Sequence, residues 1–209
     1  ATGTGLVDES TPCNPKSLYE KSKYAGEKLA LDAFERFRIP VTVLRPTIVF
    51  GEKPNRGPDS LGSWLNAIQK GWFRFFGSGD SVANYIYVGD VVNACLLLAE
   101  NEKAIGEVYI VSDPCSLRDF VGVAAEFLDV QMPGIFPTWL GYTAAIAFEA
   151  VGKLARFSPP LTVSRVRALR NQLLYSSEKI RKRLGFTPVF GWRNGLFRTV
   201  EWYKRNKLL

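Results

Sequence analysis

The order of one long helical segment and one short β-branched run most constrains how this chain can fold. Residues 17–37 place apolar or small side chains along one side of a predicted helix, which Pro40 ends. Residues 41–44 (VTVL) follow at once and are typical of a buried parallel strand. The apolar segment 91–99 predicts another helix, and residues 107–111 (EVYIV) predict a further strand. This alternation of helices and strands predicts an α/β fold.

Tyr19 and Lys23 lie four residues apart near the start of the first predicted helix, so their side chains share one face and lie within reach of each other. A phenol is a poor base at neutral pH, and a neighbouring ammonium stabilises its phenolate form. Such a tyrosine can exchange a proton with a substrate hydroxyl while a nicotinamide takes or gives the hydride. Any helix with a solvated charged face can carry the same spacing, so the pair needs support from its surroundings.

Three further segments supply that support. They read DESTP at 8–12, LRPTIVFG at 44–51 and YIYVGDVV at 85–92. With them the chain resembles, over nearly its whole length, the extended short-chain dehydrogenase/reductases, which form the NAD-dependent epimerase/dehydratase family. The C-terminal part, with LGF at 184–186 followed by Pro188, is most similar to the 3β-hydroxysteroid-dehydrogenase-like and dihydroflavonol-reductase-like members.

The resemblance implies the C-terminal part of a Rossmann-like doubly wound parallel sheet with a small, mostly helical substrate lobe. Residues 1–115 would belong to the NAD(P)-binding domain, with inserted substrate-lobe strands at about 72–88 that a turn at 77–80 separates. Residues 116–209 would form the substrate lobe and end in a helix at 195–204.

The resemblance also implies roles for single residues. Tyr19 would be the acid/base, and Lys23 would stabilise its phenolate and bind the ribose hydroxyls of the nicotinamide. The backbone of Pro46, Thr47 and Ile48 would lie against the nicotinamide and its ribose, at the carboxyl end of a strand where open α/β sheets bind ligands. An ordinary exit from a strand into a loop explains these three residues equally well. The implied cofactor is NAD or NADP, and the implied assembly is a homodimer through the helix that carries Tyr19.

The beginning of the chain departs from the family pattern. Members open with a Gly-x-x-Gly-x-x-Gly turn that holds the pyrophosphate, and this sequence has no such turn; residues 1–18 read instead as a loop rich in Thr, Gly, Pro and Ser. We therefore expect the first half of the nucleotide-binding domain to be absent. The serine or threonine of the catalytic triad and the residue that selects NAD or NADP would lie in that half. The isolated chain is accordingly expected to be inactive.

Three functions stay open. The first is an NAD(P)-dependent oxidoreductase that acts on a secondary alcohol or ketone, either a hydroxysteroid-like or another apolar small molecule. The second is a nucleotide-sugar epimerase or dehydratase; these enzymes place an arginine in the stretch that corresponds to 81–84 (SVAN), which has no basic residue, although Arg56 or Arg74 could replace it. The third is a non-catalytic fragment or degenerate binding module.

Composition excludes several other classes. The chain has no histidine, which excludes histidine-based catalysis and histidine-ligated metals. Its three cysteines show no metal spacing and fit reduced thiols, so we expect a cytoplasmic protein without a metal. The net charge of +7 comes largely from basic residues spaced like exposed helix faces, without a nucleic-acid-binding signature, so no nucleic-acid partner is expected. Asp90 is expected to be structural, as the N-cap of the helix that follows it.

Residues 130–148 form a long stretch without a charge. Pro133, Gly134, Pro137 and Gly141 interrupt it, so we expect no transmembrane span. A helix that contacts an apolar substrate or a membrane surface is expected instead.

Overall fold

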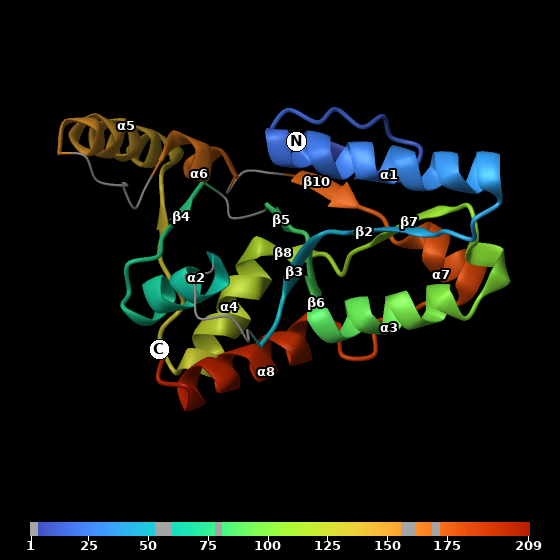
Figure 1. Ribbon diagram of the computed structural model, residues 1–209. Helices are drawn as coiled ribbons and strands as arrows, with labels where there is room; N and C mark the ends of the chain where they lie inside the picture. The colour runs from blue at the N-terminus through green and yellow to red at the C-terminus, as the bar shows by residue number, and fades with distance from the viewer. Residues whose placement is uncertain (1–3, 53–59, 78–80, 156–161, 169–171) are drawn as a thin grey trace.

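The computed structural model describes residues 4–52, 60–77, 81–155, 162–168 and 172–209 (Figure 1). Helices and short strands alternate along the chain, as the sequence predicts. The helices are α1 (Leu18–Phe37), α2 (Ser60–Gln69), α3 (Val88–Ala99), the 3-10 turn η1 (Glu102–Ala104), α4 (Leu117–Leu128), α5 (Thr138–Ala155), α6 (Val163–Ala168), α7 (Glu178–Leu184) and α8 (Gly191–Arg205). The strands are β1 (Thr4–Val7), β2 (Val43–Pro46), β3 (Ile48–Phe50), β4 (Phe75–Phe76), β5 (Val82–Ala83), β6 (Tyr85–Tyr87), β7 (Val108–Val111), β8 (Cys115–Ser116), β9 (Ile135–Phe136) and β10 (Gln172–Tyr175).

The strands pair in twos, and those far apart in sequence lie side by side. β1 runs parallel to β10, β2 to β7, β3 to β6 and β4 to β9, whereas β5 runs antiparallel to β8. Thr47 is the point at which the chain changes partner. Its backbone N–H donates to the carbonyl of Val111 on β7 (3.0 Å), and the next N–H, of Ile48, donates to the carbonyl of Asn84 (3.1 Å). β2 and β3 are thus one extended run whose first part pairs with β7 and whose second part pairs with β6.

Two expectations for the strands need correction. Residues 1–18 are not all loop, because Thr4–Val7 form β1 and pair with β10 in a register that sets Thr4 opposite Gln172. The strands expected on either side of the turn at 77–80 exist but are shorter, and they do not pair with each other. β4 takes β9 as its partner and β6 takes β3. Residues 78–80 of that turn lie outside the described residues.

Two clusters of buried side chains hold the elements together. The larger one packs α2, α4 and α8 around the strands β4 to β6, with Phe75, Phe120 and Leu196 almost fully enclosed. The smaller one joins α3, β7 and α7 through Ile86 and Ile180. β6 contributes to both clusters and therefore links them.

Asp90 is structural, but it is not the N-cap of α3. The N-cap is Tyr87, which makes no side-chain cap hydrogen bond, and Asp90 lies within the first turn of the helix. Its fully buried carboxylate accepts hydrogen bonds from the backbone N–H groups of Val189, Phe190 and Gly191 at 2.7, 2.9 and 3.0 Å. Asp90 thereby fixes the start of α8, a long-range role that the local sequence does not reveal. α8 itself begins at Gly191, four residues earlier than expected.

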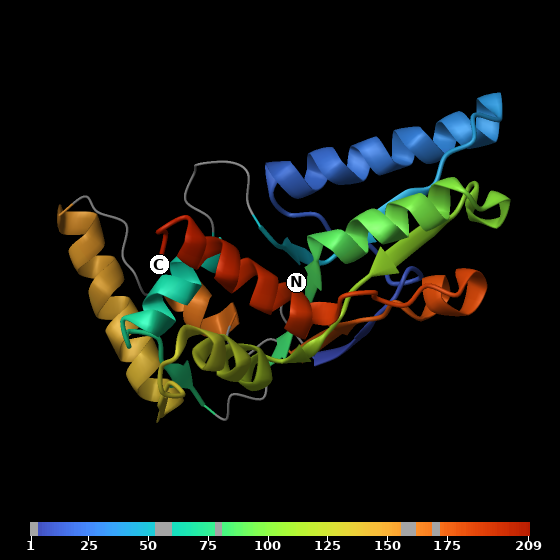
Figure 2. The same ribbon diagram turned by 90° about the horizontal axis from the view of Figure 1, so that it is seen from below.

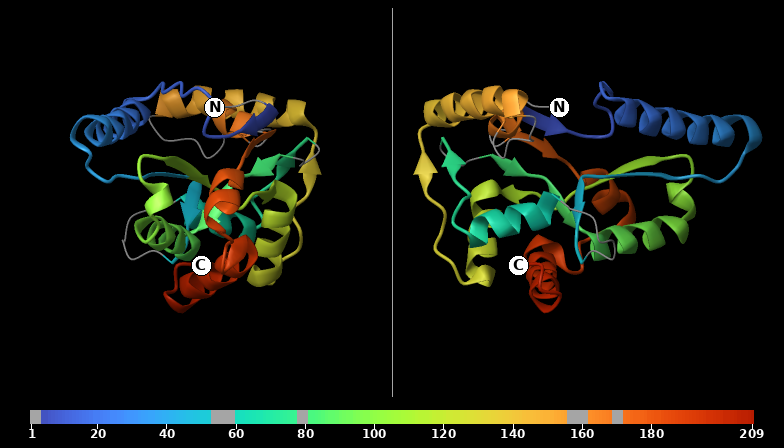
Figure 3. Two further views of the ribbon diagram at one scale, coloured as in Figure 1. Left: turned by 90° about the vertical axis from the view of Figure 1, so that its right-hand side faces the viewer. Right: turned by 60° about the vertical axis from the view of Figure 1, so that its left-hand side comes forward.

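α1 lies on the outside of the molecule, as Figure 2 and Figure 3 show. Its start is fixed by a capping box, in which the backbone N–H of Glu20 donates to Ser17 Oγ and the carboxylate of Glu20 accepts from the N–H of Ser17. None of its residues is buried. Phe34 lies against Gly106, whose φ of +79° suits glycine and whose missing Cβ leaves room for the ring. Few contacts therefore hold this helix on the body of the molecule.

α5 lies at one end of the molecule and begins later than the uncharged stretch 130–148, whose first part forms β9 and the turns around it. Within the described ranges, no helix combines the length and the apolar character needed to cross a bilayer. The division of the chain near residue 115 stays a prediction. The β5–β8 pair joins segments from both sides of that point.

Candidate functional site

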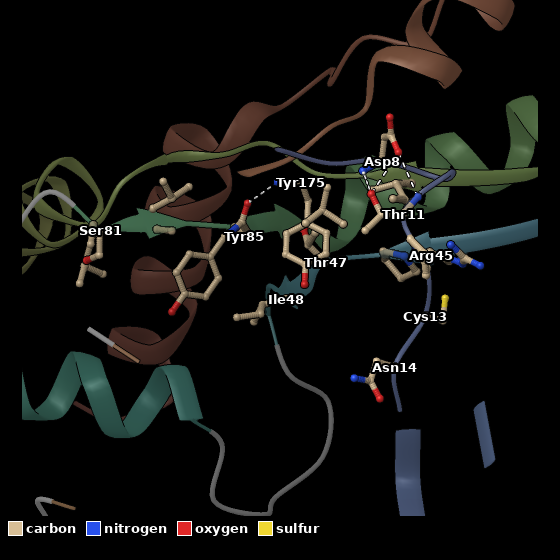
Figure 4. Close-up of a pocket in the computed structure, with 18 of the residues that line it drawn as sticks. Asp8, Thr11, Cys13, Asn14, Arg45, Thr47, Ile48, Ser81, Tyr85 and Tyr175 are labelled. Atoms are coloured by element: carbon tan, nitrogen blue, oxygen red, sulfur yellow. Dashed lines mark hydrogen bonds between the residues drawn. The ribbon is translucent and has the colours of Figure 1, made fainter. Parts of the chain in front are cut away.

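A pocket of about 620 Å³ opens at the carboxyl ends of β1 and β2 (Figure 4). Parallel strands bring their carboxyl ends to one edge, which is where open α/β sheets bind ligands. The lining residues come from most of the strands and from α2 and α4: Val7, Asp8, Thr11, Pro12, Cys13, Asn14, Arg45, Pro46, Thr47, Ile48, Trp64, Ser81, Val82, Ala83, Asn84, Tyr85, Ile110, Leu117 and Tyr175. Most of these side chains are apolar.

Asn84 builds one wall of the pocket by joining two strands. Its side-chain amide donates from Nδ2 to the carbonyl of Leu173 (2.7 Å) and accepts at Oδ1 from the N–H of Tyr175 (3.0 Å). The buried side chain therefore replaces a backbone partner along β10. This contact sets Tyr175 beside the neighbour of Asn84, Tyr85, as Figure 4 shows.

Tyr85 and Ser81 carry two of the hydroxyl groups on this wall. The Tyr85 ring stacks on Phe120 with centroids 4.4 Å apart and an interplanar angle of 19°. Burial raises the pKa of the Tyr85 phenol to about 12, so this phenol stays protonated at neutral pH. Ser81 is buried in the same wall, and its Oγ has no hydrogen-bond partner among the described residues.

Asp8 organises the opposite side of the pocket. Its Oδ1 accepts from the backbone N–H and the hydroxyl of Ser10 and from the same two groups of Thr11. The hydroxyls of Ser10 and Thr11 are the main reason that the pKa of Asp8 lies below its usual value. The next residue, Glu9, accepts the N–H of Ile110 on β7 (2.8 Å). The turn that begins at Asp8 is therefore attached to the strands.

Arg45 lines the pocket but is already paired. Its Nε donates to Glu27 Oε2 (2.9 Å) and its Nη2 donates to the other carboxylate oxygen of Glu27. The hydrogen bond to Glu27 is the main reason that the pKa of Arg45 is raised. This two-pronged pair connects α1 to the end of β2.

The three residues predicted to contact the nicotinamide, Pro46, Thr47 and Ile48, all line the pocket. The backbone donors of Thr47 and Ile48 are used between strands, and proline has none. What these residues offer to the pocket is therefore apolar side-chain surface and the Thr47 hydroxyl, rather than free N–H groups. The Ile48 side chain is 56% exposed at the opening.

Tyr19 and Lys23 lie on the first turns of α1, and Lys23 Nζ is 5.6 Å from the centroid of the Tyr19 ring. The predicted proximity of the two side chains is confirmed. Neither residue lines the pocket, and Tyr19 is 70% exposed. α1 starts at Leu18, four residues beyond Asn14 in the pocket wall, so the pair follows the pocket loop directly in the chain.

Tyr24 and Lys28 repeat the same spacing further along α1, with Lys28 Nζ 5.2 Å from the Tyr24 ring. The geometry of a tyrosine beside a lysine thus occurs twice on this helix. The Tyr19 pair is nearer in sequence to the pocket loop, which distinguishes it.

Sequence reasoning missed several pocket residues. Asn84 and Tyr85 lie in the segment 72–88, where the sequence predicts strands, and the sequence assigns no pocket role to Tyr175 or Trp64. Ser81 lies in the stretch 81–84, which stands out in the sequence only because it has no arginine. Hydrophobic patterns identify such strands but not the wall that distant strands build together.

Comparison with known proteins identifies the family. Residues 2–112 match the model of the NAD dependent epimerase/dehydratase family. The chain is 30% identical to a 3beta-hydroxysteroid-dehydrogenase/decarboxylase isoform 1 of Arabidopsis thaliana, over 98% of this chain and 50% of that protein. It is 28% identical to a dTDP-D-glucose 4,6-dehydratase of Mus musculus, over 95% of this chain and 51% of that protein. The chain thus spans about half the length of these curated relatives.

Solved structures show the fold. A UDP-glucuronic acid 4-epimerase from Bacillus cereus in complex with NAD is similar with a TM-score of 0.70 at 18% identity, covering 98% of this chain and 57% of that one. A dTDP-glucose 4,6-dehydratase from Bacillus anthracis in complex with NAD gives a TM-score of 0.68 at 22% identity, with 98% and 57% covered. The predicted Rossmann-like α/β fold is confirmed, and so, for the family, is the nicotinamide cofactor. By its sequence over more than half its length, and with the fold in agreement, this chain belongs to the NAD-dependent epimerase/dehydratase family.

Proposed function

We propose that this chain supplies the nicotinamide- and substrate-facing part of an NAD(P)-dependent oxidoreductase that acts on an apolar secondary alcohol or ketone, such as a 3β-hydroxysteroid-like molecule. The observation that carries the proposal is the charge of the pocket. Among its described lining residues Arg45 is the one cation, and Glu27 holds it. A sugar nucleotide would place a diphosphate here, which needs a free basic partner.

Of the two arginines that could replace the missing one, the described one, Arg74, does not change this conclusion. Arg74 is not a lining residue, because its Nη1 donates to the carbonyls of Gly71 and Phe73 and its guanidinium lies over the Phe136 ring. Arg56 lies outside the described residues. The uncharged wall of Val82, Ala83 and Tyr85 therefore favours an apolar substrate.

The residues at the end of β2 fit a nicotinamide cofactor. Pro46 and Ile48 offer flat apolar contact, and the Thr47 hydroxyl makes one long hydrogen bond of 3.4 Å, which leaves it able to bind a ribose or amide group. When bound, the nicotinamide accepts or supplies the hydride. In this proposal Tyr19 holds or releases the proton of the substrate oxygen, and Lys23 stabilises its phenolate and binds ribose hydroxyls.

A binding module without catalysis is the second candidate. It is favoured by the position of Tyr19 and Lys23, which are exposed and outside the pocket lining of this chain.

Dimerisation through α1 stays an expectation. The exposed Leu18, Leu29 and Phe37 give that helix an uncovered apolar surface.

The test uses the chain itself, titrated with NADH and NADPH while tryptophan quenching and nicotinamide emission are recorded. Saturable binding supports a cofactor site, and its absence up to millimolar cofactor would refute the proposal for this chain. Turnover, which is not expected of the isolated chain, is measured on the complete protein with an apolar secondary alcohol and with a nucleotide sugar as substrates. Tyr19→Phe should abolish turnover and keep cofactor binding, because only the proton-transferring hydroxyl is lost.

Tyr24→Phe is the matched control, since it removes the same atom from the other tyrosine–lysine pair of α1. It should leave turnover unchanged. Loss of turnover in Tyr24→Phe, with normal turnover in Tyr19→Phe, would show that Tyr24 rather than Tyr19 transfers the proton, and the proposal would be wrong on this point. Cofactor binding without turnover of either substrate by the complete wild-type protein would favour the binding module.

A further inference from the structure

One end of the molecule exposes an unusual number of large apolar side chains. They belong to α5, β9 and the turns before β4 and β9, which lie along the same end in Figures 1 and 2. We call this surface the apolar end, and its residues, with their exposed fractions, are Trp72 (74%), Trp139 (65%), Ile146 (60%), Ile135 (47%), Met132 (43%) and Phe136 (42%).

The members of the apolar end are connected by structure. β4 pairs with β9, so that Phe76 lies opposite Phe136, and Gly141 of α5 packs directly on the Phe76 ring. Trp139 and Ile146 are seven residues apart, which places them two turns apart on one face of α5. Thr143, between them on that face, is exposed as well. The surface therefore continues from the strand edge onto the outer side of the helix.

The stretch that forms β9 and the first part of α5 lacks the charges that a water-facing helix normally carries. Residues 130–148 contain no charged side chain. Of the two acidic residues at their ends, Asp129 is the C-cap of α4, and Glu149 accepts the backbone N–H of Val163 (2.9 Å). A helix that faces water usually turns polar side chains outward, so an uncharged outer face indicates a different surrounding.

Basic side chains lie beside the exposed rings. Lys70 Nζ is 5.2 Å from the Trp72 ring, and the Arg74 guanidinium carbon is 5.9 Å from the Phe136 ring. Amphipathic rings next to long basic side chains are typical of the boundary between lipid headgroups and acyl chains. Anionic headgroups would supply the charge complementary to Lys70 and Arg74.

We propose that the apolar end docks the protein on the surface of an anionic lipid bilayer, with Trp72, Trp139 and Ile146 inserted at the headgroup boundary and no segment crossing the membrane. Two tryptophans and several aliphatic groups give the area that interfacial binding requires, and the flanking cations give its dependence on anionic lipid.

The apolar end is also connected to the pocket. Trp64 lines the pocket and contacts Phe73 (centroids 5.4 Å apart), Phe73 contacts Phe75 (5.2 Å), and Phe75 lies opposite Ile135 in the β4–β9 pair. A row of apolar side chains thus leads from the docking surface to the pocket wall. Such a row suits a substrate that partitions into lipid. That last point rests on the proposed function, whereas the docking itself does not.

The experiment is flotation of the 209-residue chain with vesicles of phosphatidylcholine alone and with vesicles that also contain phosphatidylserine. We expect binding that is stronger with phosphatidylserine, together with a blue shift of tryptophan emission. Ile146→Glu should weaken binding about tenfold or more, because it places a charge at the boundary. Lys70→Ala should weaken binding to phosphatidylserine vesicles about fivefold and leave binding to phosphatidylcholine unchanged.

Leu29→Glu is the matched control. Leu29 on α1 is 70% exposed, comparable to Ile146, and lies outside the apolar end. All variants alter exposed residues, and equal circular dichroism spectra and melting temperatures confirm that they fold.

Equal vesicle binding by Ile146→Glu and Leu29→Glu, or no vesicle binding by the wild type, would overturn the proposal. If Ile146→Glu instead converts a dimer to a monomer while vesicles bind neither form, the surface is an interface between copies and the proposal is equally wrong. None of these readouts needs cofactor or turnover, so failure of the oxidoreductase proposal is seen separately.

Discussion

Replacing Glu27 by glutamine should loosen α1 from the rest of the molecule more than any other conservative change on this helix. The Glu27 carboxylate receives both prongs of the Arg45 guanidinium at the end of β2. α1 has no buried residue, so this ion pair and the Phe34–Gly106 contact carry much of its attachment. The glutamine keeps the size of the side chain and removes the charge and one of the two acceptors.

The expected cost follows from the exposure of the pair. The Arg45 side chain is 25% exposed and that of Glu27 is 13% exposed. Breaking an exposed ion pair costs about 0.2–1 kcal/mol, and removing one partner of a buried pair costs about 3–5 kcal/mol. A largely enclosed, bidentate pair lies between these limits, at about 2 kcal/mol. That free energy corresponds to roughly a 30-fold increase in the opening equilibrium of α1.

Native-state hydrogen exchange of the α1 amides measures this opening directly, and urea denaturation followed by circular dichroism gives the global stability. The control is Asp32→Asn, which breaks the Asp32–Arg36 pair of the same helix, where the side chains are 41% and 70% exposed. It should change protection by less than about threefold, equivalent to about 0.5 kcal/mol. If both variants change α1 protection equally, or if Glu27→Gln changes it by less than threefold, the reasoning from burial and bidentate geometry is refuted.

Two further changes test contacts at the end of β7. Gly106→Ala forces a side chain onto a residue with φ +79° and places its Cβ against the Phe34 ring of α1, so it should cost about 2–3 kcal/mol in urea denaturation. Gly185→Ala, at φ +73° with nothing within 4 Å, should cost about 1 kcal/mol, and equal losses would contradict the steric argument. Lys179 and Arg183 bind Glu107 at 2.8 and 2.7 Å and lower its pKa from the ordinary 4.5. The stability from this group is therefore complete above about pH 4.5 and is lost as the pH falls through the lowered pKa. In Glu107→Gln the melting temperature should fall less steeply below that pH than it does in the wild type. If the two proteins show the same dependence of melting temperature on pH, Glu107 does not contribute to the acid sensitivity.

The parts of the fold that depend on local pattern could be predicted from the sequence. The helix that carries Tyr19 and the strand that ends at Pro46 follow from apolar spacing and from Pro40. The pocket at Pro46, Thr47 and Ile48 follows because ligands of such sheets gather at carboxyl ends of strands. These predictions needed only neighbouring residues or a general rule of sheet topology.

The errors arose where a distant partner decides the outcome. Residues 4–7 read as loop because TGLV has no strand signal strong enough alone, and only β10, formed by Gln172–Tyr175, makes them a strand. Asp90 was assigned to the nearest helix start, yet its carboxylate accepts hydrogen bonds from backbone N–H groups 99 to 101 residues away. The walls of the candidate site have the same origin, since Asn84 reaches β10 across 89 residues. Sequence spacing does not contain these contacts.

The pairing of β1 with β10 has a consequence for the order in which the molecule assembles. Thr4 and its partner Gln172 are separated by 168 residues, so a ribosome adding about 5–20 residues per second takes roughly 8–34 s between them. Throughout that interval β10, the strand that pairs with β1 in the described part of the chain, has not been made, and the pocket wall that Asn84 and Tyr175 build is incomplete. Closing so long a loop also makes this step slow compared with formation of the helices. Ligand-binding ability should therefore arise late in biosynthesis, when β10 and the side chains that α7 and α8 add to the two buried clusters have been made, and a nascent chain stalled before residue 172 should be unable to bind.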